Sequence, residues 1–274
     1  MEFVRLDASG HLIVGSETPV PRRSPQSRST SSAIAWNPLA AQWGIVWLEG
    51  DPVKGTTLSF ARYGKDGKLV PDSFVAVRTD PELWLSPVGG SPLLWTGSGY
   101  AVAYSVGPFP TVELTELSGT GVATRRMTLD TSPNLPSDVA VAASAGGYGV
   151  AYSSVPDGHI HFARASGGAF VMGSELDLGP VGAPHASAPT VASDGTDYLV
   201  AWGQWQDDRM RSVVVARVAG GGALSWPAQA IPVKTSDWEP ELSWNGCRFA
   251  LPYQTSELLD KGARVTFFRD ALPH

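Results

Sequence analysis

The sequence predicts an all-β protein, most simply a β-propeller with five four-stranded blades. Three observations support this fold class. A short strand pattern recurs five times, further strands and glycine turns flank each copy, and the repeat is about 50 residues long. The equivalent aromatic residues are separated by 57, 48, 50 and 51 positions, at Trp47, Tyr104, Tyr152, Trp202 and Tyr253. Four-stranded units of this length fit propeller blades better than a sandwich or a solenoid.

The recurring strand alternates an aromatic, an aliphatic and a second aromatic residue. A period of two is typical of a β-strand, whose side chains point to opposite faces in turn. The intervening positions are mostly small, which would let a neighbouring sheet approach closely. The five copies are Trp43–Ile45–Trp47, Tyr100–Val102–Tyr104, Tyr148–Val150–Tyr152, Tyr198–Val200–Trp202 and Phe249–Leu251–Tyr253.

Three more strands complete each unit. An apolar segment and a short turn, usually containing glycine, precede the recurring strand, which indicates a hairpin. The strand that follows has an aromatic or aliphatic residue and an arginine, and a glycine turn and a fourth strand come next. The third-strand copies are Phe60–Arg62, Phe162–Arg164, Val215–Arg217 and Phe267–Arg269, with the divergent VELTEL at 112–117.

The chain ends are offset from these units. Residues 3–5 match a third strand and residues 10–20 match a fourth, whereas the last unit has no fourth strand of its own. We therefore expect the N-terminal strand to pair with the last blade and close the ring, which would remove exposed edges. Residues 1–274 form one domain in this interpretation, with closing strands in 1–20, a flexible link at 21–31 and blades near 32–78, 91–130, 137–178, 187–233 and 239–270.

The best-preserved copy, Ala188–Trp202 with Val213–Val218, reads A-P-x-V-A-x-D-G-x-x-Y-L-V-x-W before its A-R-V strand. This pattern resembles the repeat of large bacterial, myxobacterial-type propeller proteins. The resemblance covers nearly the whole chain as degenerate repeats. It implies a propeller fold and an exported or cell-surface protein, but no assigned activity.

Composition excludes several classes of function. The net charge is −6 and basic residues are not clustered, which argues against nucleic acid and anionic membranes as partners. No apolar run is long enough for a transmembrane helix, and the first ten residues have no signal-peptide pattern. The single cysteine, Cys247, opens an interior strand in this register and is expected to be a buried thiol. The oligomeric state stays open.

Strand order places the long, varied loops on one end of the propeller, which we call the long-loop face. It collects the loops between second and third strands and the links between blades. Aromatic and charged residues in these loops would suit a sugar, whose C–H face stacks on a ring while its hydroxyls bind charged groups. These residues are Trp84, Trp205, Asp207, Asp208, Arg209, Asp237 and Trp238.

Catalytic signals are weak. Asp138, Glu239 and Glu241 stand just before innermost strands, and Glu82 precedes one less clearly, so they could form the carboxylate pair of a glycosidase at the channel mouth. His159 and His161 lie two apart on one strand, but no third ligand has an obvious place, so no metal site is expected. No cofactor motif occurs.

The leading hypothesis is therefore a non-enzymatic recognition module that binds a glycan or a protein on the long-loop face. The alternatives are a glycoside-cleaving hydrolase with carboxylates at the channel mouth, and a scaffold fragment of a larger cell-surface propeller protein. Convergent carboxylates would favour the hydrolase, and two tryptophans flanking an open pocket would favour recognition.

Overall fold

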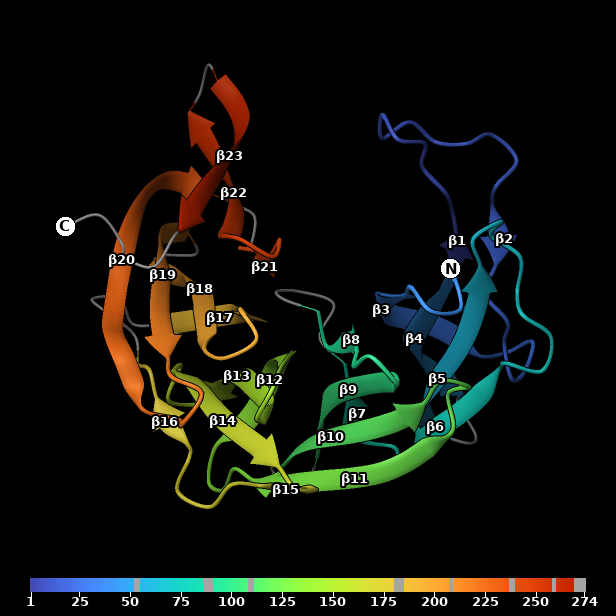
Figure 1. Cartoon of the computed structure of the whole chain (residues 1–274), viewed down its shortest axis with the longest axis horizontal. Helices are drawn as coiled ribbons and strands as arrows, with labels where there is room; N and C mark the ends of the chain where they lie inside the picture. Colours follow the sequence, from blue (N-terminus) through green and yellow to red (C-terminus); the bar gives the residue numbers. More distant parts are fainter. Residues whose placement is uncertain are drawn as a thin grey trace.

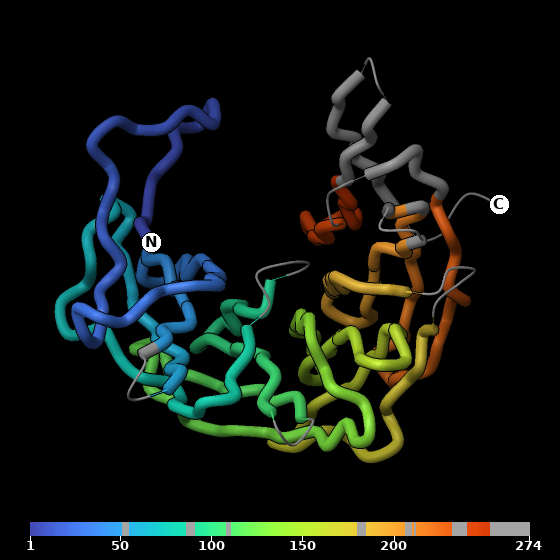
Figure 2. Tube along the Cα trace, turned by 180° about the vertical axis from the view of Figure 1, so that it is seen from behind, coloured from blue at the N-terminus to red at the C-terminus, as the bar shows by residue number. Residues whose placement is uncertain are grey.

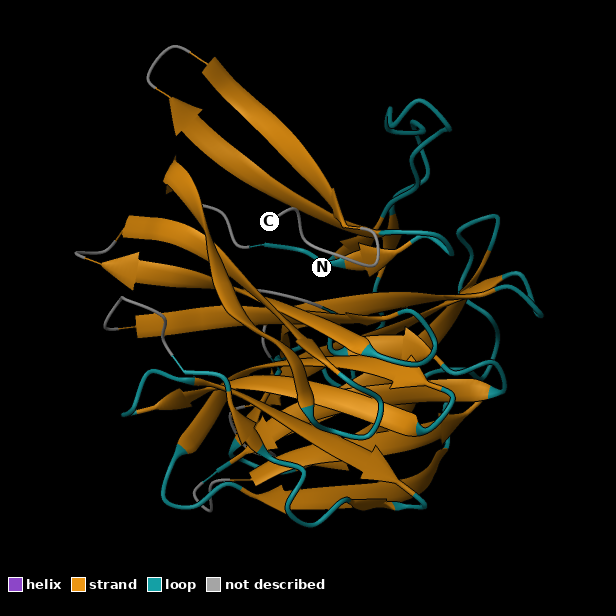
Figure 3. Cartoon of the chain, turned by 60° about the vertical axis from the view of Figure 1, so that its left-hand side comes forward, coloured by secondary structure: helices purple, strands orange, loops and turns teal. Residues whose placement is uncertain are grey.

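The computed structural model describes residues 1–51, 55–85, 91–107, 111–179, 185–206, 209–236, 240–257 and 260–268. These residues form strands and loops only, arranged as sheets around a central space (Figures 1 and 3). A search of the same residues for helices able to span a bilayer finds none. The prediction of an all-β fold is thus confirmed.

In the described residues, five antiparallel sheets follow one another along the chain after a short N-terminal one. Within each of the five, successive strands are placed from the inside of the ring outward (Figure 1). The first sheet contains β3 (Arg28–Asn37), β4 (Gln42–Asp51), β5 (Gly55–Gly64) and β6 (Val75–Thr79). The second contains β7 (Leu83–Trp84), β8 (Leu93–Trp95), β9 (Gly99–Val106), β10 (Thr111–Ser118) and β11 (Ala123–Asp130).

The remaining sheets repeat this order. The third contains β12 (Leu135–Ser144), β13 (Gly147–Val155), β14 (Ile160–Ser166), β15 (Ala169–Phe170) and β16 (Leu176–Asp177). The fourth contains β17 (His185–Ser193), β18 (Tyr198–Gln206), β19 (Arg209–Val218) and β20 (Leu224–Ser236). The fifth contains β21 (Ser243–Trp244), β22 (Phe249–Glu257) and β23 (Asp260–Phe268).

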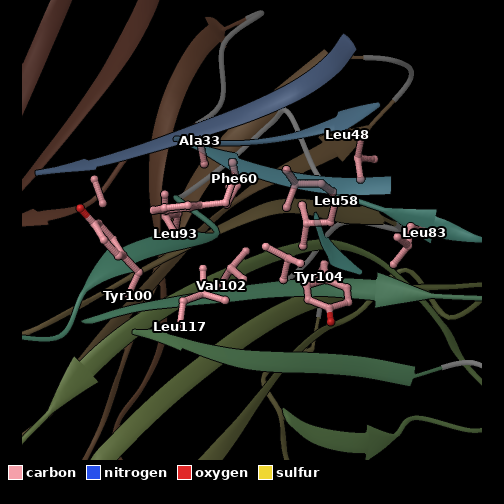
Figure 4. Close-up of a cluster of buried hydrophobic side chains, with 14 of the residues drawn as sticks. Ala33, Leu48, Leu58, Phe60, Leu83, Leu93, Tyr100, Val102, Tyr104 and Leu117 are labelled. Carbon is pink, nitrogen blue, oxygen red and sulfur yellow. The ribbon is translucent and has the colours of Figure 1, made fainter. Parts of the chain in front are cut away.

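The core lies between neighbouring sheets, where the second-strand aromatics are buried. Tyr100 of the second sheet is fully buried against Phe60 of the first, with ring centroids 5.1 Å apart (Figure 4). Tyr198 of the fourth sheet meets Phe162 of the third in the same way, at 5.3 Å. The alternation in the sequence therefore encodes these contacts between sheets, because Tyr100 and Tyr198 each pack against a phenylalanine of the sheet before their own.

Glycine makes this packing possible at two equivalent positions. A Cβ atom on Gly44 would lie 2.4 Å from Tyr100 Cε1, and one on Gly149 would lie 2.7 Å from Tyr198 Cδ1. The corresponding residue of the second sheet is Ala101, which packs in one cluster with the half-buried Tyr148. At these two positions glycine leaves room for a completely buried tyrosine ring, whereas the fourth sheet has Leu199 at the equivalent position beside Phe249.

The chain ends differ from the expectation. β1 (Glu2–Phe3) pairs with β2 (Thr18–Pro19) in a separate sheet, and among the described residues neither strand pairs with β23. The N-terminal sheet packs on the first sheet instead, where Phe3 stacks on Tyr63 with centroids 4.8 Å apart. The predicted pairing of the N-terminal strand with the last blade is therefore absent, and the ring is open between the N-terminal sheet and the fifth sheet (Figures 1 and 2).

The expectation for the cysteine was wrong. Cys247 lies in the tight turn between β21 and β22, where Asn245 Oδ1 accepts its backbone N–H at 3.0 Å, and its side chain is exposed. Turn residues point away from the sheet stack, so proximity in sequence to an interior strand does not bury the thiol.

Candidate functional site

A cavity of about 630 Å³ opens on the long-loop face between the first and second sheets. The start of β3, the end of β4, the start of β5 and the link through β7 all contribute to it. These are the chain segments that strand order places on this face. The lining residues are Gln26, Arg28, Thr30, Leu48, Gly50, Gly55, Thr56, Leu83 and Trp84.

Trp84 gives the cavity an aromatic wall. Its neighbour Leu83 is buried in the core, whereas Trp84 itself is 51% exposed. The side chains of β7 thus alternate, with Leu83 in the core and the indole of Trp84 at the surface. Ser105 Oγ donates a hydrogen bond to the Trp84 carbonyl at 3.4 Å. An exposed ring beside a cavity offers a flat apolar surface to a ligand.

Polar groups line the opposite wall. Arg28 and Thr30 are exposed at the start of β3. They are two positions apart and hence on the same face of the strand. Gln26 precedes them and lines the same cavity. A guanidinium, a hydroxyl and an amide in one cavity with a tryptophan supply the combination of donors and apolar surface that binding pockets usually have.

Buried Glu49 fixes the segment that leads into this wall. Its carboxylate accepts hydrogen bonds from the Arg23 backbone N–H and from the hydroxyls of Ser27 and Ser59. Glu49 is 1% exposed and Ser27 is 2% exposed. Residues 23–27, which lie in the stretch expected to be a link, are therefore attached to the first sheet.

Asp138 lies at the same face, on the innermost strand β12. Its Oδ2 accepts the Ser153 hydroxyl at 3.1 Å and the Ala188 backbone N–H, from the next sheet, at 3.2 Å. The register of β12 shifts between Pro136 and Val139, so Asp138 occupies a β-bulge. Bulges often redirect a side chain at functional sites.

The same bulge recurs in other innermost strands. β3 shifts register around Ser31 and β17 shifts around Ala188, and both residues have a positive φ, of 43° and 54°. Strand pairing therefore makes Ser31, Asp138 and Ala188 equivalent, and only Asp138 among them carries a charge. The carboxylate is thus a local departure from the repeat and not a consequence of it.

The other predicted site residues are not gathered around one pocket in the described part of the chain. Trp205 lies near the end of β18, is half-buried and packs in the core between the fourth and fifth sheets. It lies far along the ring from Trp84. Glu82 and Glu241 are exposed. Asp207, Asp208, Asp237, Trp238 and Glu239 lie outside the described residues, as does the side chain of Arg209.

The two histidines contact carboxylate groups. His159 Nδ1 lies 2.9 Å from Asp177 Oδ2, and the imidazole of His161 lies between Asp157, at 3.3 Å, and Glu175, at 3.6 Å. Among the described residues, no group of three or more His, Cys, Asp or Glu has a geometry that could hold a metal ion.

Sequence reasoning missed one buried polar cluster. Glu113 of β10 is 5% exposed and accepts a hydrogen bond from the Tyr104 hydroxyl at 2.8 Å. Arg78 and Arg126 approach the same carboxylate at 3.2 and 3.3 Å. The divergent VELTEL segment, which replaces the F-A-R pattern in this repeat, was the available signal.

Tyrosine with a carboxylate can act as a nucleophile, but this pair is not placed to do so. Burial, and then the charge of Glu113, raise the pKa of Tyr104 well above its ordinary value. Tyr104 is completely buried, so its hydroxyl stays protonated and reaches no ligand. The cluster joins the outer strands of the first two sheets.

The comparisons with known proteins establish the fold but no family. No protein-family model and no curated protein matches the chain. Among solved structures, a subtype N10 neuraminidase-like protein of A/little yellow-shouldered bat/Guatemala/060/2010 is 14% identical, with a TM-score of 0.57 over 91% of this chain and 80% of that one.

Two other solved structures have the same kind of fold. The Hadza microbial sialidase Hz136 is 11% identical, with a TM-score of 0.54 over 84% of this chain, which spans only 51% of the sialidase. An endo-arabinase from Bacteroides thetaiotaomicron VPI-5482 is 12% identical, with a TM-score of 0.50 over 89% of this chain and 95% of that one.

These structures correct the leading functional hypothesis from the sequence. A non-enzymatic recognition module was expected, but two of the similar structures are glycan-cleaving enzymes, a sialidase and an endo-arabinase. The hydrolase alternative agrees with them better. At 11–14% identity the likeness extends to the fold alone, an all-β arrangement of antiparallel sheets like that of propeller proteins.

Proposed function

We propose that this chain is a glycoside-cleaving hydrolase whose substrate lies on the long-loop face. The observation that supports this most directly is the cavity between the first two sheets. It combines the exposed Trp84 with the donors of Gln26, Arg28 and Thr30, on the face where Asp138 also stands. We propose in addition that the five sheets are the blades of one propeller ring.

Asp138 is our candidate for the base or nucleophile. Glycoside hydrolysis commonly uses two carboxyl groups, one donating a proton to the leaving oxygen and one acting as base or nucleophile. The Ser153 hydroxyl and the Ala188 backbone N–H both donate to Asp138 Oδ2, as they would to the carboxylate of a base or nucleophile. Those contacts also fix its position relative to the innermost strands.

The candidates for the proton donor are the other carboxylic acids on this face. Glu82 immediately precedes the cavity residues Leu83 and Trp84, and it is exposed. Its backbone is fixed, because Asp80 Oδ1 accepts its N–H at 3.1 Å and its carbonyl accepts the Gly107 N–H at 3.0 Å. Glu241 is the second candidate and stands before β21, beyond the fourth sheet.

A panel of chromogenic glycosides and polysaccharides tests the proposal. The substrate that the wild-type protein cleaves is then used with Asp138→Asn, Glu82→Gln, Glu241→Gln and Trp84→Ala. Loss of a catalytic carboxylate should lower kcat by about 10²–10⁴-fold, the usual contribution of acid–base catalysis. Trp84→Ala should raise KM with a smaller effect on kcat, because it removes binding surface only.

Asp66→Asn is the matched control, since Asp66 is an exposed carboxylate in the turn that follows β5, at the opposite end of the sheet. It should leave kcat and KM unchanged. Cleavage of no glycan in the panel would refute the proposal. So would wild-type kcat in the Asp138→Asn protein.

A further inference from the structure

The first sheet has an exposed apolar face, whereas the equivalent faces of the third and fourth sheets are buried. Ile34, on the innermost strand β3, is 46% exposed. Strand pairing makes it equivalent to Val141 of β12 and Val191 of β17, because each faces the central aliphatic residue of the neighbouring second strand. Val141 is only 5% exposed and Val191 only 7%.

The preceding sheet accounts for this difference. Val141 belongs to a buried cluster that includes Ala101 and Ala103 of the second sheet, and Val191 belongs to one that includes Ala151 of the third. On the first sheet, the N-terminal strands cover only the outer part of the same face. Phe3 and Val20 bury Tyr63 and Ala61, whereas Ile34 and Trp36 stay exposed.

A cavity of about 220 Å³ marks the uncovered part. It lies between the N-terminal sheet and the inner strands β3 and β4, and its lining includes Met1, Phe3, Val20, Ile34 and Ile45. Such an apolar recess at the inner end of an otherwise repeated interface is where the inner strands of a preceding sheet would lie.

We propose that the inner strands of the fifth sheet, β21 and β22, dock on this face and close the ring. The repeat specifies the contact. In two interfaces a first aromatic of one sheet meets a glycine of the sheet before it, as Tyr100 meets Gly44 and Tyr198 meets Gly149. Trp43 and Ala250 hold these two positions at the ends of the ring, in the first and fifth sheets, and both are half-exposed.

The edge of β22 that faces the outside of the ring explains how the open arrangement arises. In the docked position, β22 would run beside the edge of β1 that does not pair with β2. β22 now pairs along that edge with β23, over Phe249–Glu257. The third-strand pattern occurs in both segments, at Phe3–Arg5 and Phe267–Arg269, so β1 and β23 compete for one edge of β22.

The only cysteine of the chain provides a direct test. The turns that join first and second strands touch in a regular interface, since Ala145 of the third sheet donates its N–H to Gly195 of the fourth at 2.8 Å. Cys247 lies in this turn of the fifth sheet. Leu39, 79% exposed, lies in the equivalent turn of the first sheet.

Leu39→Cys therefore places a second thiol opposite Cys247 only if the ring closes. The purified full chain is treated with diamide, and its free thiols and mass are measured without reductant. Closure should convert both thiols into an intramolecular disulfide, because such a bond requires Cα atoms within about 7 Å. Ala40→Cys, in the same turn, is the second variant if Leu39→Cys folds poorly.

Ser98→Cys is the matched control, because Ser98 is exposed in the same turn of the second sheet, one sheet farther from the fifth. It should keep both thiols free. Two free thiols in the folded Leu39→Cys and Ala40→Cys proteins would overturn the proposal, and a disulfide-linked dimer would assign the face to a second copy of the chain instead. The test does not depend on enzymatic activity, so it can fail or succeed independently of the proposed hydrolase.

Discussion

Gly149→Ala tests whether the sheets are as closely packed as the repeat implies. The new Cβ would lie 2.7 Å from Phe162 Cε2 and from two ring carbons of Tyr198, about 0.7 Å less than the 3.4 Å of ordinary contact. Neither ring has free space, because both are completely buried. Overpacking of a core typically costs about 1–3 kcal/mol.

The backbone effect of the substitution has the opposite sign. Gly149 has no positive φ, so alanine fits the backbone and stabilises by about 0.4–1 kcal/mol through the unfolded chain. The net loss is then about 1–2 kcal/mol. At roughly 2–4 °C per kcal/mol for a domain near this size, Tm should fall by about 2–8 °C.

Thermal unfolding followed by circular dichroism measures this change. Gly221→Ala is the control, because no atom lies within 4 Å of its Cβ position and its φ is also ordinary. It should keep or slightly raise Tm. Adding Tyr198→Leu to Gly149→Ala should reveal a favourable coupling between the two sites, since the smaller side chain relieves the clash. Equal Tm values for Gly149→Ala and Gly221→Ala would refute the packing argument.

Two further predictions concern buried polar groups. Glu113→Gln should lower the free energy of unfolding by about 1–3 kcal/mol, because Arg78 and Arg126 lose a charged partner; an unchanged urea midpoint would contradict it. Burial raises the pKa of Tyr63 to about 12. The pKa of tyrosine in the unfolded chain is about 10, so the folded state favours the neutral hydroxyl more than the unfolded chain does. The resulting contribution to the free energy of unfolding is complete below pH 10 and is lost as the pH rises through 12. Tyr63→Phe should make the free energy of unfolding between pH 10 and 12 less dependent on pH. Urea midpoints that fall equally with pH in both proteins would exclude this contribution.

The strands and their order within each sheet can be read from the sequence. Alternating aromatic and small residues define the second strand of each unit, and the pairing of Trp47, Tyr104, Tyr152 and Trp202 with their neighbours follows that register. The signal is strong because strand periodicity and sheet packing depend on the same residues. Any shift by one position would turn the large rings away from the core.

Part of the candidate site was also accessible from the sequence. Trp84 was selected as an aromatic residue in a long loop and Asp138 by its place before an innermost strand, and both lie on the long-loop face. The polar wall of Gln26, Arg28 and Thr30 was not found, because it lies at the end of a stretch whose composition favoured a link. Its order depends on Glu49, which is distant in sequence and buried only in the folded chain.

The arrangement of the two ends of the ring could not be predicted from the sequence and follows from long-range contacts. The sequence holds two segments with third-strand character, and no local pattern distinguishes which of them pairs with β22. Phe3 packs on Tyr63 and β23 pairs with β22, and these long-range contacts separate the two ends of the ring. Periodicity specifies the interior of each repeat, whereas the closure of a ring depends on competition between segments more than 200 residues apart.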